Sequence, residues 1–182
     1  ILCLKLFSDT SVWSELADKY KVREYVKSCG LEYCLVNLYG VWYEADDFDM
    51  SNLPESFVLK ANNGDGKGGN LFILNKDVED KEYIVKILKT WLSKKNIGAL
   101  SAEPQYKNIK PCVIAEEILP IKTNEKSIVD YKMWCFCGKV HFIWTCSNRS
   151  NRGTDVMTYD RDWNAHPEYC VFNNRYRKAQ LM

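Results

Sequence analysis

Residues 57–69 read Phe57-Val58-Leu59-Lys60-Ala61-Asn62-Asn63-Gly64-Asp65-Gly66-Lys67-Gly68-Gly69, an apolar run that delivers one lysine into a glycine-rich loop. Glycines let backbone N–H groups approach an anion without interference from a Cβ atom, and a neighbouring lysine adds positive charge. The stretch therefore predicts a strand over 57–61 that leads into a polyphosphate-binding loop. A flexible hairpin turn between two strands has the same composition, so that alternative stays open.

The loop lacks the spacing of a Walker A loop, because no Gly-Lys-Ser/Thr triplet closes it and no helical pattern follows. Lys60, in the strand before the loop, is the strongest single candidate for a phosphate ligand. A lysine at the end of a buried strand costs free energy unless its charge meets an anion.

Length and composition indicate one globular domain or two tightly joined subdomains, since 182 residues with 46% hydrophobic content can bury a core. The 25 basic and 24 acidic residues leave a net charge of +1, which gives no reason to expect a nucleic-acid partner. No apolar run approaches the roughly 20 residues of a membrane span. Because the chain starts at Ile1 without a methionine, a fragment of a longer protein is one interpretation.

The cysteines favour a reducing, cytoplasmic location. Cys34, Cys135 and Cys137 lie in or beside apolar runs, where a free thiol behaves as a small buried hydrophobe. No Cys-x-x-Cys motif occurs, so a structural zinc site is not expected. The full set is Cys3, Cys29, Cys34, Cys112, Cys135, Cys137, Cys146 and Cys170.

In the first part of the chain, Asp18 and Gly30 bracket an expected amphipathic helix with an N-cap and a glycine stop. Its apolar residues have helical spacing: Val22, Tyr25, Val26 and Cys29. We expect a strand over 34–39 and an acidic loop over 44–49.

Beyond the glycine loop, residues 71–74 predict the returning strand, and a helix follows behind the acidic residues Asp77, Glu79 and Asp80. The apolar positions of that helix are Ile84, Ile87, Leu88, Trp91 and Leu92. A buried strand over 112–115 runs into Glu116 and Glu117. Residues 131–146 predict a hairpin, residues 147–177 a polar loop, and residues 175–178 the start of another helix.

The order of these parts resembles the ATP-grasp superfamily, most closely its TupA-like branch of bacterial polysaccharide and teichuronopeptide biosynthesis proteins. The matching pieces are Asp18-Lys19-Tyr20 with Val22-Arg23, Leu53-Pro54 with Phe57-Val58-Leu59-Lys60, Gln105-Tyr106-Lys107-Asn108-Ile109-Lys110-Pro111, Ala115-Glu116-Glu117, Asp130-Tyr131-Lys132, and Tyr159-Asp160 with Asp162-Trp163. Several pieces in one order are more specific than any single piece.

The resemblance implies an α+β, ATP-grasp-like fold with ATP between two small α+β subdomains. It divides the chain into an N-terminal helix and strand (1–55), an N-subdomain with the glycine-rich loop and hinge (56–118), and an incomplete C-subdomain (119–182). The implied activity is that of an ATP-dependent carboxylate–amine ligase, which works through an acyl phosphate. Its partners would be ATP, Mg²⁺ and a carboxylate-bearing substrate such as an amino acid, a uronic acid or a peptide.

The resemblance also implies which residues hold the nucleotide. Lys19 and Lys60 would hold the α and β phosphates, although Lys19 is equally typical of a solvated helix residue. The loop would close over the phosphates through Asn63, Gly64, Gly66, Lys67, Gly68 and Gly69. Glu116 and the backbone of Glu117 and Ile118 would take the adenine edge. The two glutamates could instead be one exposed and one ion-paired carboxylate.

Further along, Asp130 would accept from the ribose hydroxyls and Lys132 would reach the γ phosphate. Asp130 and Lys132 are two residues apart, so in a strand their side chains lie on the same face. The alternative is that they form an ion pair with each other. Arg149 and Arg152 would hold the transferred phosphoryl group or an acidic substrate, or serve only as loop solvation.

Two features depart from the family pattern. TupA-like proteins usually carry His-Gly-Ser-Gly after the strand lysine, whereas this loop holds Asp65, whose charge repels phosphate unless Lys67 or Mg²⁺ offsets it. The acidic metal ligands of ATP-grasp enzymes lie on late strands, and the sequence stops before any such residues. We therefore assign no metal ligand and expect weak nucleotide binding or slow turnover.

Two other functions compete with this one. A glycosyltransferase is suggested by two Asp-x-Asp triplets, Asp47-Phe48-Asp49 and Asp160-Arg161-Asp162, although the βαβ unit that should precede such a motif is missing. A non-catalytic or truncated ATP-grasp module that serves as a scaffold is the other alternative.

Overall fold

The computed structural model describes residues 2–64, 68–94, 97–98, 102–121, 127–150 and 153–170. The chain divides into two compact units, Ile1–Ile118 and Leu119–Met182. Each unit contains one antiparallel sheet, and the α-helices that the structure describes belong to the first. The fold is therefore α+β, as the sequence predicts.

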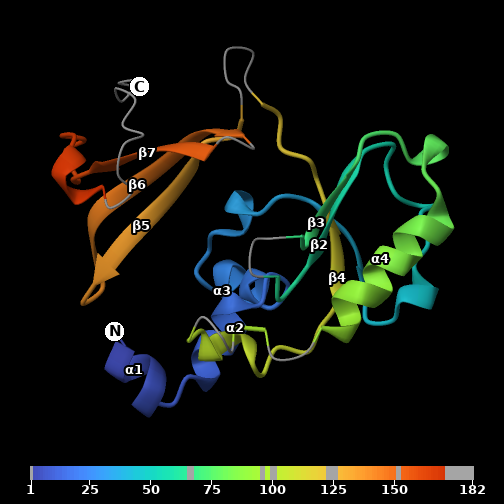
Figure 1. Cartoon of the computed structure of the whole chain (residues 1–182), viewed down its shortest axis with the longest axis horizontal. Coiled ribbons are helices and arrows are strands. Elements are labelled where there is room, and N and C mark those ends of the chain that lie inside the picture. Colours follow the sequence, from blue (N-terminus) through green and yellow to red (C-terminus); the bar gives the residue numbers. More distant parts are fainter. Residues whose placement is uncertain are drawn as a thin grey trace. The chain divides into compact units, whose positions relative to one another are not determined.

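The sheet of the first unit has the strand order β1-β4-β2-β3, and Figure 1 labels β2, β3 and β4. Every pairing in it is antiparallel. Its strands are β1 (Leu38–Trp42), β2 (Phe57–Ala61), β3 (Asn70–Ile73) and β4 (Val113–Glu116). The helices of this unit are α1 (Leu2–Phe7), α2 (Ser11–Ala17), α3 (Val22–Ser28) and α4 (Lys81–Ser93). The predicted strands over 57–61, 71–74 and 112–115 are confirmed, with small shifts at their ends.

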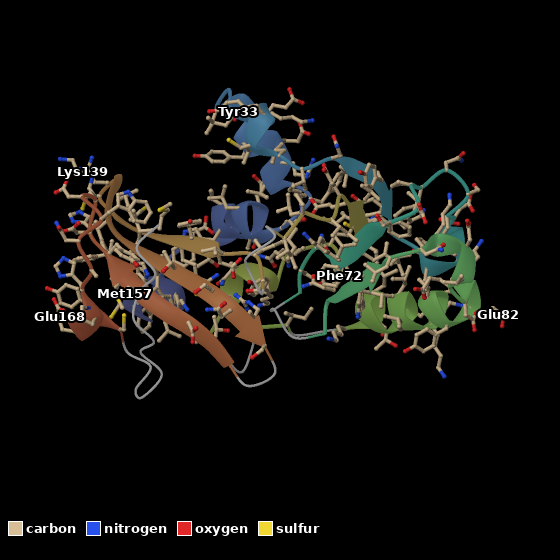
Figure 2. The ribbon with its side chains drawn as sticks, turned by 90° about the horizontal axis from the view of Figure 1, so that it is seen from above. Tyr33, Phe72, Glu82, Lys139, Met157 and Glu168 are labelled. Carbon is tan, nitrogen blue, oxygen red and sulfur yellow. The ribbon has the colours of Figure 1, made fainter. Side chains whose placement is uncertain are left out.

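Helix α4 covers one face of this sheet (Figure 1). It begins where expected, because the Asp80 carboxylate accepts from the backbone N–H groups of Glu82 and Tyr83. Figure 2 shows Glu82 on this first turn and Phe72 on β3. The core between helix and sheet is formed by Phe57, Leu59, Ala61, Ile73, Ile84, Leu88, Trp91, Val113 and Ala115, with Ala45, Phe48 and Leu53 beside them.

The other face of the sheet carries the charged side chains. Successive side chains of a strand point to opposite faces, so Leu59 and Ala61 face α4 while Lys60 faces away from it. The same alternation places Ala115 toward α4 and Glu116 on the face of Lys60. Since Val58 pairs with Glu116 in the β2–β4 register, Lys60 lies diagonally across from Glu116.

Helix α3 differs from its prediction in start and in buried face. It begins at Val22, and the Asp18 carboxylate accepts from the N–H groups of Tyr20 and Lys21 in the preceding turn. The predicted apolar face is not the buried one: Tyr25 is 57% exposed, whereas Arg23 is buried. The spacing of the apolar residues does not identify the buried face of α3, because the buried side chain is Arg23, which pairs with Glu116.

The glycine stop of α3 is confirmed. Gly30 has a φ of 73°, and the N–H of Leu31 reaches the carbonyl of Val26 while that of Gly30 reaches Lys27. These two bonds form a Schellman motif. The predicted strand over 34–39 is wrong, because residues Glu32–Cys34 form a 3-10 helix and the strand begins at Leu38.

The second unit is a three-stranded sheet in the order β5-β6-β7. Its strands are β5 (Asp130–Phe136), β6 (Lys139–Ser150) and β7 (Gly153–Tyr159). The predicted hairpin is confirmed, and both of its turn residues, Cys137 and Gly138, have positive φ, as a tight two-residue turn requires. Figure 2 labels Lys139, where β6 begins, and Met157 on β7.

Two further predictions are wrong, one for residues 147–177 and one for the cysteines. Residues 147–177 are not a loop throughout, because β6 extends to Ser150 and β7 follows it. Cys34, Cys135 and Cys137 are exposed, so core packing does not explain these thiols. The buried cysteines are Cys112, Cys146 and Cys170. The helix predicted from residue 175 lies outside the described residues.

No helix in the described part of the chain combines the length and apolarity needed to cross a membrane.

Candidate functional site

The base of the glycine-rich loop is closed by backbone contacts between β2 and β3. The N–H of Ala61 donates to the carbonyl of Gly69 at 2.9 Å, and the N–H of Gly64 donates to the carbonyl of Ala61 at 3.2 Å. A Cβ on Gly69 would lie 3.4 Å from the Cα of Gly64, at the edge of van der Waals contact, so the two backbone segments lie side by side. Gly68 has a φ of 74°. The loop thus enters and leaves through a narrow neck, while its predicted phosphate ligands Gly66 and Lys67 lie outside the described residues.

Lys19 reaches this neck from the turn between α2 and α3. Its ammonium group donates to the carbonyl of Gly64 at 2.8 Å and to that of Ala61 at 3.3 Å. Its backbone N–H donates to the carbonyl of Asn62 at 3.1 Å. The resemblance implies that Lys19 holds phosphate, and the structure places its ammonium group at the start of the loop that was expected to bind phosphate.

Asn62 fixes the end of β2 from within the core. Its Nδ2 donates to Oδ1 of Asp18 and to the carbonyl of Lys110, each at 3.0 Å, and its Oδ1 accepts from the N–H of Cys112 at 2.8 Å. The side chain is fully buried and Asp18 nearly so. Sequence reasoning missed this role, although an asparagine at a strand end next to a turn is a recognisable signal for it.

Lys60 and Glu116 form an ion pair that a third residue completes. The ammonium of Lys60 lies 2.8 Å from Oε2 of Glu116, and the guanidinium of Arg23 lies 2.9 Å from Oε1. The Glu116 side chain is 8% exposed and that of Lys60 is 29% exposed. The anion that Lys60 meets in this structure is therefore Glu116, and Lys60 keeps a partly open side.

The backbone around the end of β4 is partly engaged. Glu117 donates its N–H to the carbonyl of Asn37 at 3.0 Å, and its carboxylate accepts from the side chain of Asn37 at 2.8 Å. The backbone of Glu117 was expected at the adenine edge, but its N–H already donates to the Asn37 carbonyl. Ile118, which is half-buried, follows Glu117 directly. The two glutamates fit the alternative in which one carboxylate is buried in an ion pair and the other is exposed.

Asn63 is buried at the neck and lines a cavity of about 20 Å³ with Gly64, Gly69 and Trp91. That volume holds about one water molecule. The cavity therefore does not accommodate a nucleotide base.

In the second unit, Asp130 pairs with Arg149 and not with Lys132. The backbone N–H of Arg149 donates to the hydroxyl of Ser127 at 2.9 Å, which holds it beside the start of β5. Lys132 is exposed on β5. Of the four residues predicted here, the structure joins two, Asp130 and Arg149, while Arg152 lies outside the described residues.

A histidine cluster in the second unit was not predicted. The ring of His166 lies 2.9 Å from a carboxylate oxygen of Glu168 and 3.2 Å from one of Asp160, and it stacks on Tyr169. The hydrogen bonds to Glu168 and Asp160 raise the pKa of His166. The side chain of Asn164, the largest cause, lowers the pKa of Asp160 to about 2. Figure 2 labels Glu168 on the short helix after β7.

The structure was searched for side chains that could together bind a metal ion, within residues 2–64, 68–94, 97–98, 102–121, 127–150 and 153–170. No group of three or more histidine, cysteine, aspartate or glutamate side chains in these ranges could hold an ion. The Asp-x-Asp triplets do not change this result. Asp49 accepts from Ser51, and Asp160 accepts from Asn164 and His166, so these carboxylates cap turns. We assign no residue to Mg²⁺.

Comparison with models of known protein families identifies a match over almost the whole chain. The family model described as TupA-like ATPgrasp matches residues 2–180 of the chain. No curated protein and no solved structure shows significant similarity to it. The matched region includes the strand lysine Lys60, the glycine-rich loop and the Glu116-Glu117 pair. The chain belongs to the TupA-like ATP-grasp family.

Proposed function

We propose that the first unit holds the phosphates of ATP at the neck of the glycine-rich loop. The observation that carries this proposal is the placement of Lys19, whose ammonium group lies on the carbonyls of Gly64 and Ala61. Lys60 is the second-last residue of β2 and directly precedes Ala61. Two lysines from distant parts of the chain thus serve one loop, and ammonium groups on long stems suit polyphosphate.

An ammonium group has three N–H donors, so Lys60 can keep Glu116 as a partner and still donate to a phosphate oxygen. Its 29% exposed side chain leaves room for that contact. Asn63 and the glycines Gly64, Gly68 and Gly69 form the described part of the cradle, where the absence of Cβ atoms lets backbone N–H groups approach an anion. From the family resemblance, we propose that Gly66 and Lys67 also bind phosphate.

For the adenine ring, we propose fewer protein contacts than the family resemblance implies. The carboxylate of Glu116 has more acceptor sites than its two cations use, so it can still accept from an amino group. Of the two backbone groups expected at adenine, we propose the N–H of Ile118 as the donor, because the N–H of Glu117 donates to Asn37. Asp130 for ribose, Lys132 for the γ phosphate and Arg149 with Arg152 for the transferred group remain proposals that rest on the family resemblance.

The proposed reaction is carboxylate–amine ligation. A carboxylate oxygen of the substrate attacks the γ phosphorus of ATP and ADP leaves. An amine then attacks the acyl carbon, phosphate leaves, and the amine loses a proton. When bound with ATP, Mg²⁺ supplies charge neutralisation for phosphoryl transfer. The carboxylate would belong to an amino acid, a uronic acid or a peptide used in cytoplasmic synthesis of a bacterial surface polysaccharide.

Calorimetric titration of the chain with Mg·ADP tests the nucleotide site. Lys60→Met should weaken binding at least about tenfold, since a charge-assisted hydrogen bond to phosphate is lost. The variant should still fold, because Arg23 continues to neutralise Glu116. Lys86→Met removes the same charge from an exposed position on α4 and should leave the affinity unchanged.

Equal affinity of Lys60→Met and the unaltered chain would contradict a phosphate site at Lys60. Absence of any binding to the unaltered chain would favour the scaffold alternative. A glycosyltransferase would instead bind a sugar nucleotide in preference to ADP, and that outcome would also overturn the proposal.

A further inference from the structure

Arg23 is the third charged residue of the group that contains Lys60 and Glu116. It belongs to α3, is buried, and lies 93 residues from Glu116 in the sequence. One guanidinium nitrogen donates to Oε1 of Glu116 at 2.9 Å and another donates to the carbonyl of Val36 at 2.6 Å. Because both contacts hold the planar group in place, Arg23 is fixed toward Glu116.

The charges of the three residues explain what this contact does. Lys60 and Glu116 alone form a neutral pair, which offers a phosphate no net attraction. Arg23 raises the charge of the group of three to +1 while both oxygens of Glu116 stay paired. Each pair is at least partly shielded from water, so the charges act more strongly than they would on the surface.

We propose that Arg23 is a positioning residue of the nucleotide site: it neutralises Glu116, so that Lys60 can donate to phosphate with a positive charge that Glu116 does not cancel. This inference rests on the proposed function. Without Arg23, Lys60 is the only cation on Glu116 among the described residues. Any contact that draws Lys60 toward phosphate then exposes the carboxylate to a second negative charge.

Mg·ADP affinities of four variants of the full chain test this inference. Arg23→Gln should weaken binding at least about tenfold, because the remaining pair is neutral. Arg23→Gln combined with Glu116→Gln restores a net charge of +1 and should bind within about threefold of the Glu116→Gln single variant. Arg23→Lys keeps the charge without the planar fork, and should retain most of the affinity that Arg23→Gln loses.

The background with Glu116→Gln separates this role from a purely structural one. A structural defect caused by loss of Arg23 would lower the affinity in both backgrounds, whereas the proposed role requires the Glu116 carboxylate and disappears when Glu116→Gln removes it. The groups that face Glu116 are Arg23 from α3 and Lys60 from β2, and Glu117 turns to Asn37.

The outcomes distinguish the two proposals. If the unaltered chain does not bind Mg·ADP, the proposed function fails and this inference fails with it. If the unaltered chain binds and folded Arg23→Gln binds equally well, only the inference fails. Should Arg23→Gln not fold, the comparison of Glu116→Gln with the double variant decides, because neither holds an unpaired carboxylate. A loss of affinity in the double variant relative to Glu116→Gln would show that Arg23 acts independently of Glu116.

Discussion

The side-chain amide of Asn62 donates to Oδ1 of Asp18 at 3.0 Å, which joins the end of β2 to the turn before α3 inside the core. This contact holds Lys19, the next residue after Asp18, where its ammonium group reaches the neck of the glycine-rich loop. The position of a proposed phosphate ligand is thus set by a buried amide.

Asn62→Ala should therefore destabilise the first unit. The substitution leaves the buried N–H of Cys112 without its acceptor and removes one partner of the Asp18 carboxylate. Unsatisfied buried polar groups of this kind cost roughly 2–4 kcal/mol in the free energy of unfolding. Urea denaturation measures the change, and Asn52→Ala at an exposed position is the control. Equal loss in both variants would refute the role of Asn62.

Lys19→Met should loosen the neck of the loop. The ammonium group bridges the carbonyls of Ala61 and Gly64, so its removal should raise the hydrogen-exchange rate of the Ala61 N–H, which donates to Gly69. Lys21→Met, two residues away and exposed, should leave that rate unchanged. If both variants exchange at the rate of the unaltered chain, Lys19 does not hold the neck.

Thiol reactivity should follow burial. Burial raises the pKa of the Cys112 thiol to about 12, and the charge of Asp18 acts in the same direction. At pH 8 this thiol is almost wholly protonated, so it should resist iodoacetamide under native conditions. Exposed Cys135 and Cys137 should be alkylated within the same time. Mass spectrometry of peptides gives the result, and early labelling of Cys112 would contradict its buried position.

The histidine cluster predicts a pH dependence of the second unit. The raised pKa of His166 means that its contribution to stability is fully present below about pH 6.5 and is lost as the pH rises through the folded-state value. Asp160, whose pKa is lowered to about 2, contributes above about pH 3.8 and loses that contribution as the pH falls toward 2. Together the two groups contribute most to the stability of the second unit between about pH 3.8 and about pH 6.5.

NMR titration of the His166 ring tests this dependence. The midpoint should lie above 6.5 in the unaltered chain and move down in Glu168→Gln, since the hydrogen bond to Glu168 is the largest cause of the raised pKa. A midpoint that Glu168→Gln leaves in place would show that the cluster does not set the protonation of His166.

The sequence predicts the parts of the fold whose pattern is local. Strand β2, helix α4 and the β5–β6 hairpin follow from apolar periodicity, an aspartate N-cap and a turn glycine. Strand β7 escapes prediction because its polar residues, such as Asp155, weaken the pattern. Strand β1 begins later than predicted because a 3-10 helix, Glu32–Cys34, takes up the start of the predicted range.

The candidate site shows the same division. Lys60 is recognisable because a lysine in an apolar strand needs an anion, and the structure supplies Glu116. The role of Arg23 is not recognisable, because its partner is 93 residues away and local periodicity marks other residues of α3 as buried. Asn62 similarly bonds to residues 44 to 50 positions distant.

The most direct test of the central claim is a residue-by-residue NMR titration of the ¹⁵N-labelled chain with Mg·ADP and, separately, with adenosine. Mg·ADP should shift the backbone amides of Lys19, Gly64, Gly68 and Gly69, and adenosine alone should leave these four in place because it carries no phosphate. Shifts that Mg·ADP produces only away from these residues, for example along the lysine-rich surface of α4, would contradict a phosphate site at the neck of the loop.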